Sequence, residues 1–209
     1  MPGLPRGLYA ITPDDPDTER LAARVAAAIA GGAAAVQYRN KSASAALARA
    51  QAARLATLCR DAGVPLIVND DVRLALEVDA AGAHLGAEDG DLAAARSLLG
   101  PRRLLGASCY DRPALASVAR EAGADHVAFG SVFASATKPD AARAPLALFG
   151  DAAARAGLPA VAIGGITVEN AGEAIAAGAH AVAVITDLFD AADIAARAAL
   201  YRRLFERSA

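Results

Sequence analysis

Short apolar runs alternate with longer amphipathic runs along almost the whole chain. The apolar runs are continuous and often end at a polar residue, which is typical of parallel strands covered on both faces. They predict strands at Leu8–Thr12, Ala34–Arg39, Leu66–Asn69, Ala83–Gly86, Leu104–Ser108, His126–Val132, Ala160–Ile163 and Ala181–Thr186. The amphipathic runs predict helices at Glu19–Ala30, Ala45–Ala62, Val72–Ala81, Leu92–Leu99, Pro113–Ala122, Leu146–Ala156, Val168–Ala177 and Ala191–Phe205. Ser44, Asp91 and Thr167 are expected to cap the helices that follow them.

This repeating order of strand and helix predicts an α/β fold, a (β/α)₈ TIM barrel in a single domain that spans residues 1–209. Ala81-Gly82-Ala83, Ala122-Gly123-Ala124 and Ala177-Gly178-Ala179 each close a helix and open a strand, which forms a weak internal repeat. The competing architecture is an open doubly wound sheet. The absence of a glycine-rich dinucleotide fingerprint after the first strand weakens that alternative.

One connection breaks the repeat. The segment 133–145 is long and has no clear periodicity. Loops of this kind inside a compact domain are often lids or binding loops. Because this one follows the sixth strand, it is expected to be a lid loop at the face where barrel active sites lie.

Composition and charge exclude several function classes. The formal net charge is −2 and hydrophobic residues make up 55% of the chain, without a basic stripe or a long apolar segment. We therefore expect no nucleic-acid partner, no membrane partner and a cytoplasmic location. Cys59 and Cys109 are expected to be reduced thiols. The sequence leaves open whether the chain forms a homo-oligomer.

The three histidines, His84, His126 and His180, fall in or beside predicted strands. No other imidazole or cysteine lies at metal-ligand spacing from them. We expect each to be a structural histidine with satisfied hydrogen bonds.

Charged residues of both signs gather at the predicted strand ends and in the lid. The cations are Arg39, Lys41 and Lys138, and the carboxylates are Asp70 and Asp89. Carboxylates would repel an anionic ligand unless Mg²⁺ lay between them and a diphosphate, an arrangement that Mg²⁺ commonly adopts. The alternative is a salt-bridge network at the barrel rim without a metal. Asp71, in contrast, is expected only to start a helix.

A second anion site is indicated after the last two strands, at Gly164-Gly165 and Ile185-Thr186. Barrels commonly hold a phosphate on backbone amides at this place, and glycine allows close approach. Two phosphate sites imply two phosphorylated small-molecule substrates or one long bisphosphate. Ser108 alone is a weak signal, because a strand-end serine often only forms a local hydrogen bond.

In their order along the chain, these motifs resemble the thiamine-phosphate synthase (thiamine-phosphate pyrophosphorylase) family over essentially the full length. The matching segments are Leu8-Tyr9-Ala10-Ile11-Thr12, Gln37–Lys41, Asn69-Asp70-Asp71, Gly82–Asp89, Gly106-Ala107-Ser108, Gly130–Lys138, Ile163–Ile166 and Val184-Ile185-Thr186. Each segment is unspecific, but the ordered set is specific.

The resemblance implies a role for each matching residue. The residues implied to bind the pyrimidine diphosphate are Gln37, Tyr38, Arg39, Asn40, Lys41, Asn69, Ser108 and Lys138. Catalysis is implied for Lys138, Arg39, Lys41 and Ser108. The thiazole phosphate is implied to contact Ser135, Ala136, Thr137, Gly165, Ile185 and Thr186. Asp70 and Asp89 are implied to ligate the cofactor, Mg²⁺.

The reaction implied by the resemblance joins 4-amino-2-methyl-5-(diphosphooxymethyl)pyrimidine to 4-methyl-5-(2-phosphoethyl)thiazole, or to its 2-carboxylated form. It would give thiamine phosphate and pyrophosphate, with CO₂ from the carboxylated thiazole, by a dissociative mechanism. The rival functions are a related thiazole tautomerase, a non-catalytic barrel that binds a phosphorylated ligand, and a phosphosugar isomerase. Retention of Asp70, Asp89 and the segment Ser135–Lys138 favours the synthase over the tautomerase, and the complete charge at the rim argues against a non-catalytic barrel. The two carboxylates and three cations exceed what the one phosphate of an isomerase substrate needs.

The chain departs from the family pattern at several positions. Asn40 stands where glutamate is frequent, Ala87 where glutamine is frequent, and Tyr110 where histidine is frequent. In the lid, Ala134 and Ala136 replace frequent prolines and Ser135 a frequent threonine. These departures are expected to affect substrate affinity more than reaction type, because both proposed metal ligands and all three cations are present.

Overall fold

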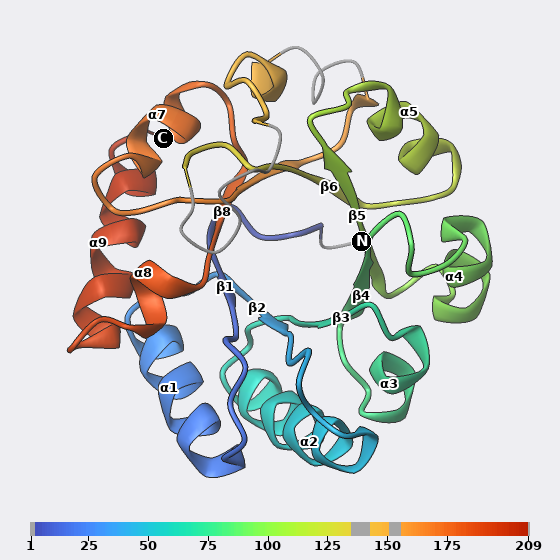
Figure 1. The fold of residues 1–209 in the computed structure, drawn as a ribbon, viewed down its shortest axis with the longest axis vertical. Coiled ribbons are helices and arrows are strands. Elements are labelled where there is room, and N and C mark those ends of the chain that lie inside the picture. Colours follow the sequence, from blue (N-terminus) through green and yellow to red (C-terminus); the bar gives the residue numbers. More distant parts are fainter. Residues whose placement is uncertain (1–2, 135–142, 151–155, 209) are drawn as a thin grey trace.

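The computed structural model describes residues 3–134, 143–150 and 156–208. Within them, eight strands form a closed barrel in sequence order, which confirms the predicted (β/α)₈ fold (Figure 1). The strands are β1 Gly7–Ile11, β2 Ala35–Tyr38, β3 Leu66–Asn69, β4 Gly82–Leu85, β5 Leu104–Tyr110, β6 His126–Phe129, β7 Ala160–Ile163 and β8 Ala181–Val184.

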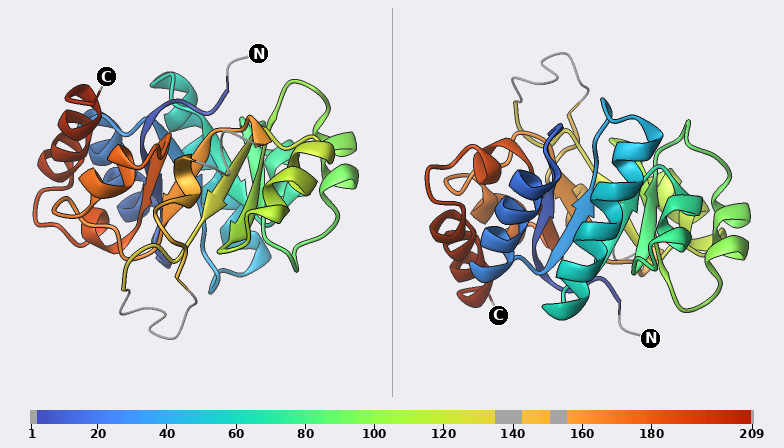
Figure 2. Two further views of the ribbon diagram at one scale, coloured as in Figure 1. Left: turned by 90° about the horizontal axis from the view of Figure 1, so that it is seen from above. Right: turned by 90° about the horizontal axis from the view of Figure 1, so that it is seen from below.

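Every neighbouring pair of strands is parallel, and β8 closes the barrel against β1, with Leu8 opposite Val182. The carboxyl ends of all eight strands therefore lie at one face, which we call the carboxyl face. Segments that are far apart in the sequence meet there. The side views show the strands in the centre with helices packed outside them (Figure 2).

Helices surround the barrel on its outer side (Figure 1). The described helices are α1 Thr18–Ala30, α2 Ala45–Asp61, α3 Val72–Glu77, α4 Leu92–Leu99, α5 Ala114–Glu121, α7 Ala171–Ala176, α8 Thr186–Phe189 and α9 Ile194–Glu206. The predicted helix Leu146–Ala156 falls partly outside the described residues. Among the described helices, none is long and apolar enough to cross a membrane.

Side-chain caps fix where several helices begin. Ser44, Asp71 and Asp91 each accept a hydrogen bond from a backbone N–H in the first turn of the following helix, as the sequence predicts. The predicted cap at Thr167 is wrong. Residues 168–170 form a turn, and α7 begins only at Ala171, after Asn170.

The last part of the chain differs most from the prediction. The apolar run of the eighth strand was expected to continue to Thr186, but β8 ends at Val184 and Thr186 starts the short helix α8. The final helix, α9, then begins at Ile194 behind its cap Asp193. The sixth strand is also shorter than expected and ends at Phe129 instead of Val132.

Apolar side chains form two layers, because alternate strand residues point to opposite sides. Leu8 and Val36 face the helices, in an outer layer that also holds the free thiols of Cys59 and Cys109. Tyr9 faces the barrel interior. Burial of an aliphatic side chain such as Leu8 or Val36 contributes roughly 1.5–3 kcal/mol to stability.

Candidate active site

Asp70 and Asp89 lie together at the carboxyl face, beside Lys41. Asp70 directly follows β3 and has a left-handed backbone with φ 64°, and its N–H donates to the carbonyl of His84 at 2.8 Å. Asp89 lies in the loop after β4, where its Oδ2 accepts from the N–H of Gly86 at 2.8 Å. The ammonium of Lys41 forms an ion pair with Asp70.

The surroundings of Asp70 disfavour its negative charge. Burial raises the pKa of Asp70, and contact with Asp89 raises it further, whereas the hydrogen bond from Lys41 lowers it. Among the described residues, no lysine or arginine forms an ion pair with Asp89. Of the two adjacent carboxylates, Asp70 alone is paired with an ammonium among the described residues, and a divalent cation would relieve their repulsion. One or two carboxylates with room for phosphate oxygens and water fit Mg²⁺.

The alternative prediction was that the rim cations pair with Asp70 and Asp89 in a purely structural network, and only one such pair is found among the described residues. Lys41 does pair with Asp70, but Arg39 pairs with Asp14 instead, with 3.2 Å between Nη1 and Oδ1. The same Oδ1 of Asp14 accepts from the backbone N–H of Lys41 at 3.1 Å. Asp14 thereby holds the guanidinium of Arg39 and the backbone of Lys41 at the rim, and the sequence analysis had not singled it out.

The run Gln37–Lys41 divides between two faces of β2 and the loop after it. Gln37 points into the barrel, where its amide donates to the hydroxyl of Tyr9 at 3.0 Å. Tyr38 points outward and donates to Oε1 of Gln51 at 3.0 Å. Thr12 fixes the loop, because its hydroxyl bonds both the carbonyl and the N–H of Arg39 at 2.8 Å. The structure therefore brings Gln37, but not the side chain of Tyr38, to the barrel interior.

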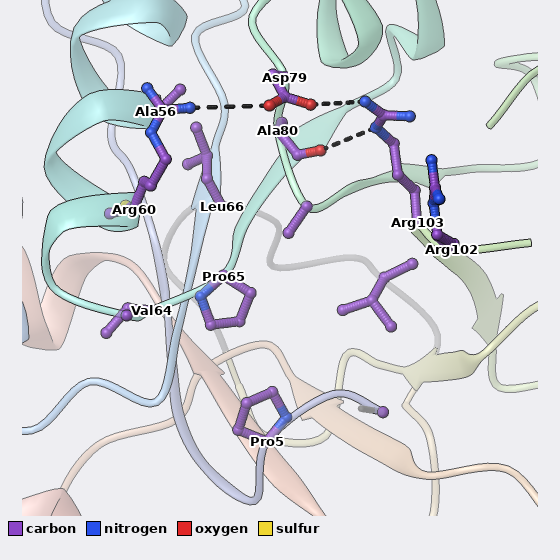
Figure 3. Close-up of a pocket in the computed structure, with 15 residues that line it drawn as sticks. Pro5, Ala56, Arg60, Val64, Pro65, Leu66, Asp79, Ala80, Arg102 and Arg103 are labelled. Atoms are coloured by element: carbon purple, nitrogen blue, oxygen red, sulfur yellow. Dashed lines mark hydrogen bonds and ion pairs between the residues drawn. The ribbon is translucent and has the colours of Figure 1, made fainter. Parts of the chain in front are cut away.

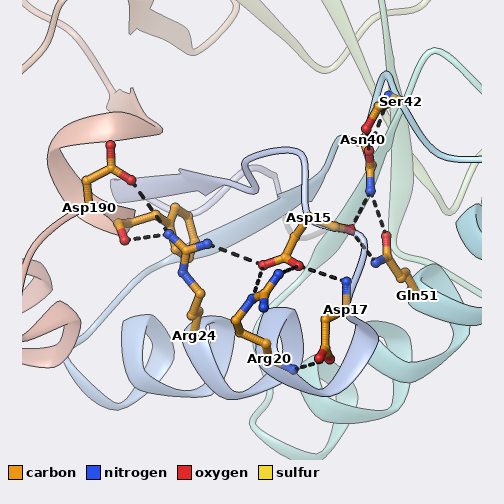
Figure 4. Close-up of polar contacts among 9 residues, drawn as sticks. Asp15, Asp17, Arg20, Arg24, Asn40, Ser42, Gln51 and Asp190 are labelled. Atoms are coloured by element: carbon orange, nitrogen blue, oxygen red, sulfur yellow. Dashed lines mark hydrogen bonds and ion pairs between the residues drawn. The ribbon is translucent and has the colours of Figure 1, made fainter.

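Asn40 is occupied by contacts within the protein. Its amide donates to the carbonyl of Asp15 at 2.9 Å and to Gln51 at 3.0 Å, and its Oδ1 accepts from the hydroxyl of Ser42 at 2.9 Å (Figure 4). These contacts indicate that Asn40 holds the loop of Arg39 and Lys41. The residue that replaces the frequent glutamate therefore contacts other protein groups in a supporting role.

Asp15 lies at the centre of the polar contacts that support this loop (Figure 4). Its side chain is only 2% exposed and accepts from Arg20 at 3.0 and 2.6 Å and from the N–H of Asp17 at 2.8 Å. The hydrogen bond from Arg20 is the largest of the effects that lower the pKa of Asp15, and burial acts against them. Asp15 thus ties the loop after β1 to the loop after β2.

We expect Asp15→Asn to lower the free energy of unfolding by about 1–3 kcal/mol, because the buried carboxylate loses its charged hydrogen bonds. The effect is limited because the partner, Arg20, is exposed and solvent screens its charge. A depressed folded-state pKa gives stability that is present above the usual value of 3.8 and is lost as the pH falls through the folded value. Urea unfolding of both proteins at several pH values checks this. Equal stabilities at neutral pH would contradict it.

Tyr110 supports the loop that carries Asp89. Its hydroxyl accepts from the N–H of Ala87 at 3.2 Å, and its backbone is left-handed with φ 53°. A Cβ added to Gly86 would lie 2.7 Å from Oδ2 of Asp89 and 3.3 Å from the Tyr110 hydroxyl. The two residues that depart from the family pattern, Ala87 and Tyr110, are therefore hydrogen-bonded to each other. Gly86 leaves room for the close approach of Asp89.

Ser108 and the histidines form the polar part of the barrel interior. Ser108, near the end of β5, lies with its Oγ 3.0 Å from Nε2 of His84, and Asn69 at the end of β3 is the strand partner of His84 on β4. The expectation of a satisfied histidine is confirmed for His180, whose Nε2 contacts the carbonyl of Leu4 at 2.8 Å. It is wrong for His126 and for Nδ1 of His84, which have no hydrogen-bond partner among the described residues.

The predicted phosphate site after β7 and β8 has the expected backbone. Gly164 and Gly165 have φ values of 99° and 63°, which side chains rarely adopt. Ile185 and Thr186 follow the neighbouring strand β8. Asn170 holds this turn, because its amide donates to the carbonyl of Gly165 at 2.9 Å. The sequence analysis had not singled out Asn170.

The lid residues Ser135, Ala136, Thr137 and Lys138 lie outside the described residues. The flanks of the segment 133–145 are held against the barrel. The N–H of Phe133 donates to the carbonyl of Gly164 at 3.0 Å, and that of Ala144 to the carbonyl of Ser131 at 2.9 Å. Both ends of the predicted lid therefore start at the carboxyl face.

A cavity of about 590 Å³ lies at the opposite face, at the amino ends of β3 and β5 (Figure 3). Its arginines Arg60 and Arg103 are each within ion-pair distance of Asp79, at 3.9 and 2.6 Å. This cavity is remote from the acidic pair, and its lining carboxylate, Asp79, is already paired with two arginines. The chemistry of the carboxyl face therefore defines the candidate site.

The closed parallel barrel, with a carboxylate pair, cations and a diglycine turn at its carboxyl face, places this protein in the class of (β/α)₈-barrel enzymes. The comparisons with known proteins narrow the class. The sequence profile described as thiamine monophosphate synthase matches residues 8–188. The chain belongs to this family, and it is an enzyme of the transferase class.

Individual relatives agree along nearly their whole lengths. The chain is 57% identical over 201 residues to the thiamine-phosphate synthase of Aromatoleum aromaticum, covering 96% of this chain and 97% of the relative. It is 60% identical over 198 residues to that of Chromobacterium violaceum, with 95% of each chain covered. The solved thiamine phosphate pyrophosphorylase of Pyrococcus furiosus superimposes with a TM-score of 0.86 at 33% identity, covering 97% and 96% of the two chains.

Proposed function

We propose that this protein condenses 4-amino-2-methyl-5-(diphosphooxymethyl)pyrimidine with 4-methyl-5-(2-phosphoethyl)thiazole, or its 2-carboxylated form, to give thiamine phosphate. Pyrophosphate leaves, together with CO₂ when the thiazole is carboxylated. The names of the relatives support thiamine phosphate as the product. The observation that carries the proposal is the Asp70–Asp89 pair beside Lys41 at the carboxyl face.

The pyrimidine diphosphate would lie across β2, β3 and β5. Gln37, Asn69 and Ser108 would contact the pyrimidine from the barrel interior. Arg39, whose guanidinium Asp14 holds, and Lys41, whose backbone Asp14 holds, would bind the diphosphate oxygens together with Lys138 of the lid. Tyr38 and Asn40 would contribute by fixing the backbone of this segment, because their side chains contact Gln51 and Asp15.

Asp70 and Asp89 would hold Mg²⁺, and the donor set fits this ion, since the two carboxylates repel each other without it. Bound there, Mg²⁺ would neutralise negative charge on the diphosphate and act as a Lewis acid. Lys41 would remain between Asp70 and the phosphate oxygens. The left-handed backbone of Asp70 is the kind of strained geometry that concentrates at functional sites.

The reaction would begin with cleavage of the C–O bond between the pyrimidine methylene carbon and the diphosphate. The bonding electrons leave with pyrophosphate, and a pyrimidine-stabilised cation remains. The thiazole nitrogen then attacks this carbon. The chain supplies fixed positive charge at Arg39, Lys41 and Lys138 for the departing pyrophosphate, and such preorganised charge is often the largest contribution to catalysis.

The thiazole phosphate would lie on the backbone amides of Gly165, Ile185 and Thr186. Ser135, Ala136 and Thr137 of the lid would close over it and keep water from capturing the cation. This arrangement places the two substrates on opposite sides of the barrel mouth, with the reacting atoms between them.

The direct test is an assay of pyrophosphate release with both substrates, with and without Mg²⁺. We expect release only when both substrates and the metal are present. Release without the thiazole, or without metal after exhaustive chelation, would contradict the proposal. Isomerisation of the carboxylated thiazole alone, without pyrophosphate, would instead favour the tautomerase.

A further inference from the structure

Three strands place two histidines on either side of a glycine inside the barrel. Gly106 on β5 is paired with His84 on β4 and with His126 on β6. Both imidazoles are buried, with exposed fractions of 6% and 0%, and their ring centroids are 5.6 Å apart. The rings occupy the space that a side chain at position 106 would take, because a Cβ there would lie 2.3 Å from Nδ1 of His84 and from Nε2 of His126.

This packing favours one of the two tautomers of His84. A hydrogen of Gly106 points in the direction of the missing Cβ, and therefore toward Nδ1 of His84. An N–H at Nδ1 would face this C–H, whereas a lone pair there accepts it as a weak contact. A neutral imidazole has one protonated nitrogen. The ring of His84 is buried, and among the described residues no carboxylate forms an ion pair with it, so the neutral form is favoured and its proton lies on Nε2.

Nε2 of His84 faces the hydroxyl of Ser108 at 3.0 Å. If Nε2 carries the proton, it donates to Oγ, and the hydroxyl keeps its own proton for another acceptor. Ser108 is half-buried near the carboxyl end of β5, so that acceptor lies at the mouth of the barrel. We propose that His84 is a positioning residue that holds the Ser108 hydroxyl as a hydrogen-bond donor toward the bound pyrimidine diphosphate.

This inference rests on the proposed function for the identity of the substrate. The orientation of the hydroxyl itself rests on the contacts between His84, Gly106 and Ser108. If His84 only fills space, its replacement changes stability without acting through Ser108. The two cases differ in a double-mutant cycle, because positions that act through one another are not additive.

The experiment measures kcat and KM for the pyrimidine diphosphate in the wild type, His84→Leu, Ser108→Ala and the double variant. We expect His84→Leu to lower kcat/KM by about 10-fold to 100-fold. In the Ser108→Ala background it should have no further effect. Losses that multiply in the double variant would overturn the proposal.

Two further variants separate positioning from packing. His84→Gln should retain most of the activity, because its amide N–H can reach Oγ of Ser108. His180→Gln is the matched control, since this histidine bonds the carbonyl of Leu4 at the other end of the barrel. It should leave kcat/KM unchanged. A His84→Gln variant as impaired as His84→Leu would count against the role.

A second measurement does not depend on turnover or on the folding of a variant. Long-range ¹H–¹⁵N correlation spectra of the labelled wild type should show His84 in the Nε2–H form near neutral pH. The Nδ1–H form would overturn the proposal. A wild type that releases no pyrophosphate would contradict the proposed function, while these spectra would still test the positioning of Ser108.

Discussion

Asp70→Asn lowers kcat by about 10²–10³-fold and raises the Mg²⁺ concentration needed for half-maximal activity, if the loss resembles that of one transition-state contact elsewhere. Asparagine matches aspartate in size and tolerates the left-handed backbone that Asp70 adopts with φ 64°, so the fold is kept. The substitution removes one negative charge from the pair that faces Lys41. Steady-state rates over a Mg²⁺ titration measure both effects.

Asp79→Asn is the matched control for this prediction. Asp79 also has a left-handed backbone, with φ 53°, but it lies at the opposite face, where it pairs with Arg103. Its replacement should leave the Mg²⁺ titration unchanged. A titration of Asp70→Asn that coincides with the wild type would show that Asp70 is not a metal ligand.

Gly165→Ala should lower kcat/KM for the thiazole phosphate by about 10²-fold, because small misplacements near a reacting ligand have effects of this size. A Cβ at this position would lie 2.2 Å from the carbonyl oxygen of Ala134 and 2.7 Å from that of Phe133. The turn must therefore shift, and with it the amides proposed to bind the phosphate. The kinetic constants for the two substrates, measured separately, check this.

Gly63→Ala is the control for backbone strain. Gly63 has a similar φ of 68°, but an added Cβ would meet nothing within 4 Å. The left-handed backbone alone costs an alanine about 1–2 kcal/mol. Gly63→Ala should thus lose stability but keep its affinity for the thiazole phosphate. If Gly165→Ala matches it in both properties, the phosphate site lies elsewhere.

The local sequence pattern was sufficient to predict the bounds of strands whose ends are marked by proline, glycine or a polar residue. The bounds of β3 and β7 were predicted correctly, because both apolar runs follow a proline and end before a polar residue or a glycine. The end of β8 was not predictable in this way. Val184 and Ile185 continue the apolar run, and nothing local shows that the chain turns into α8 after them.

The site was predictable at its charged strand ends and not in its supporting contacts. Asp70, Asp89 and Lys41 follow strands, so the fold alone brings them to one face. Period-two alternation could have separated Tyr38 from Gln37, since neighbouring strand residues face opposite sides. The meeting of His84 and His126 over Gly106 depends on the register between three strands, which no local pattern encodes.

The central claim is that a divalent ion between Asp70 and Asp89 binds the diphosphate that leaves. The most direct measurement is the anomalous diffraction of crystals grown with Mn²⁺ and the pyrimidine diphosphate, without the thiazole phosphate that would allow turnover. We predict one peak bonded to oxygens of both carboxylates and of the diphosphate, at about 2.0–2.3 Å. A peak that contacts neither aspartate, with the diphosphate bound, would contradict the account.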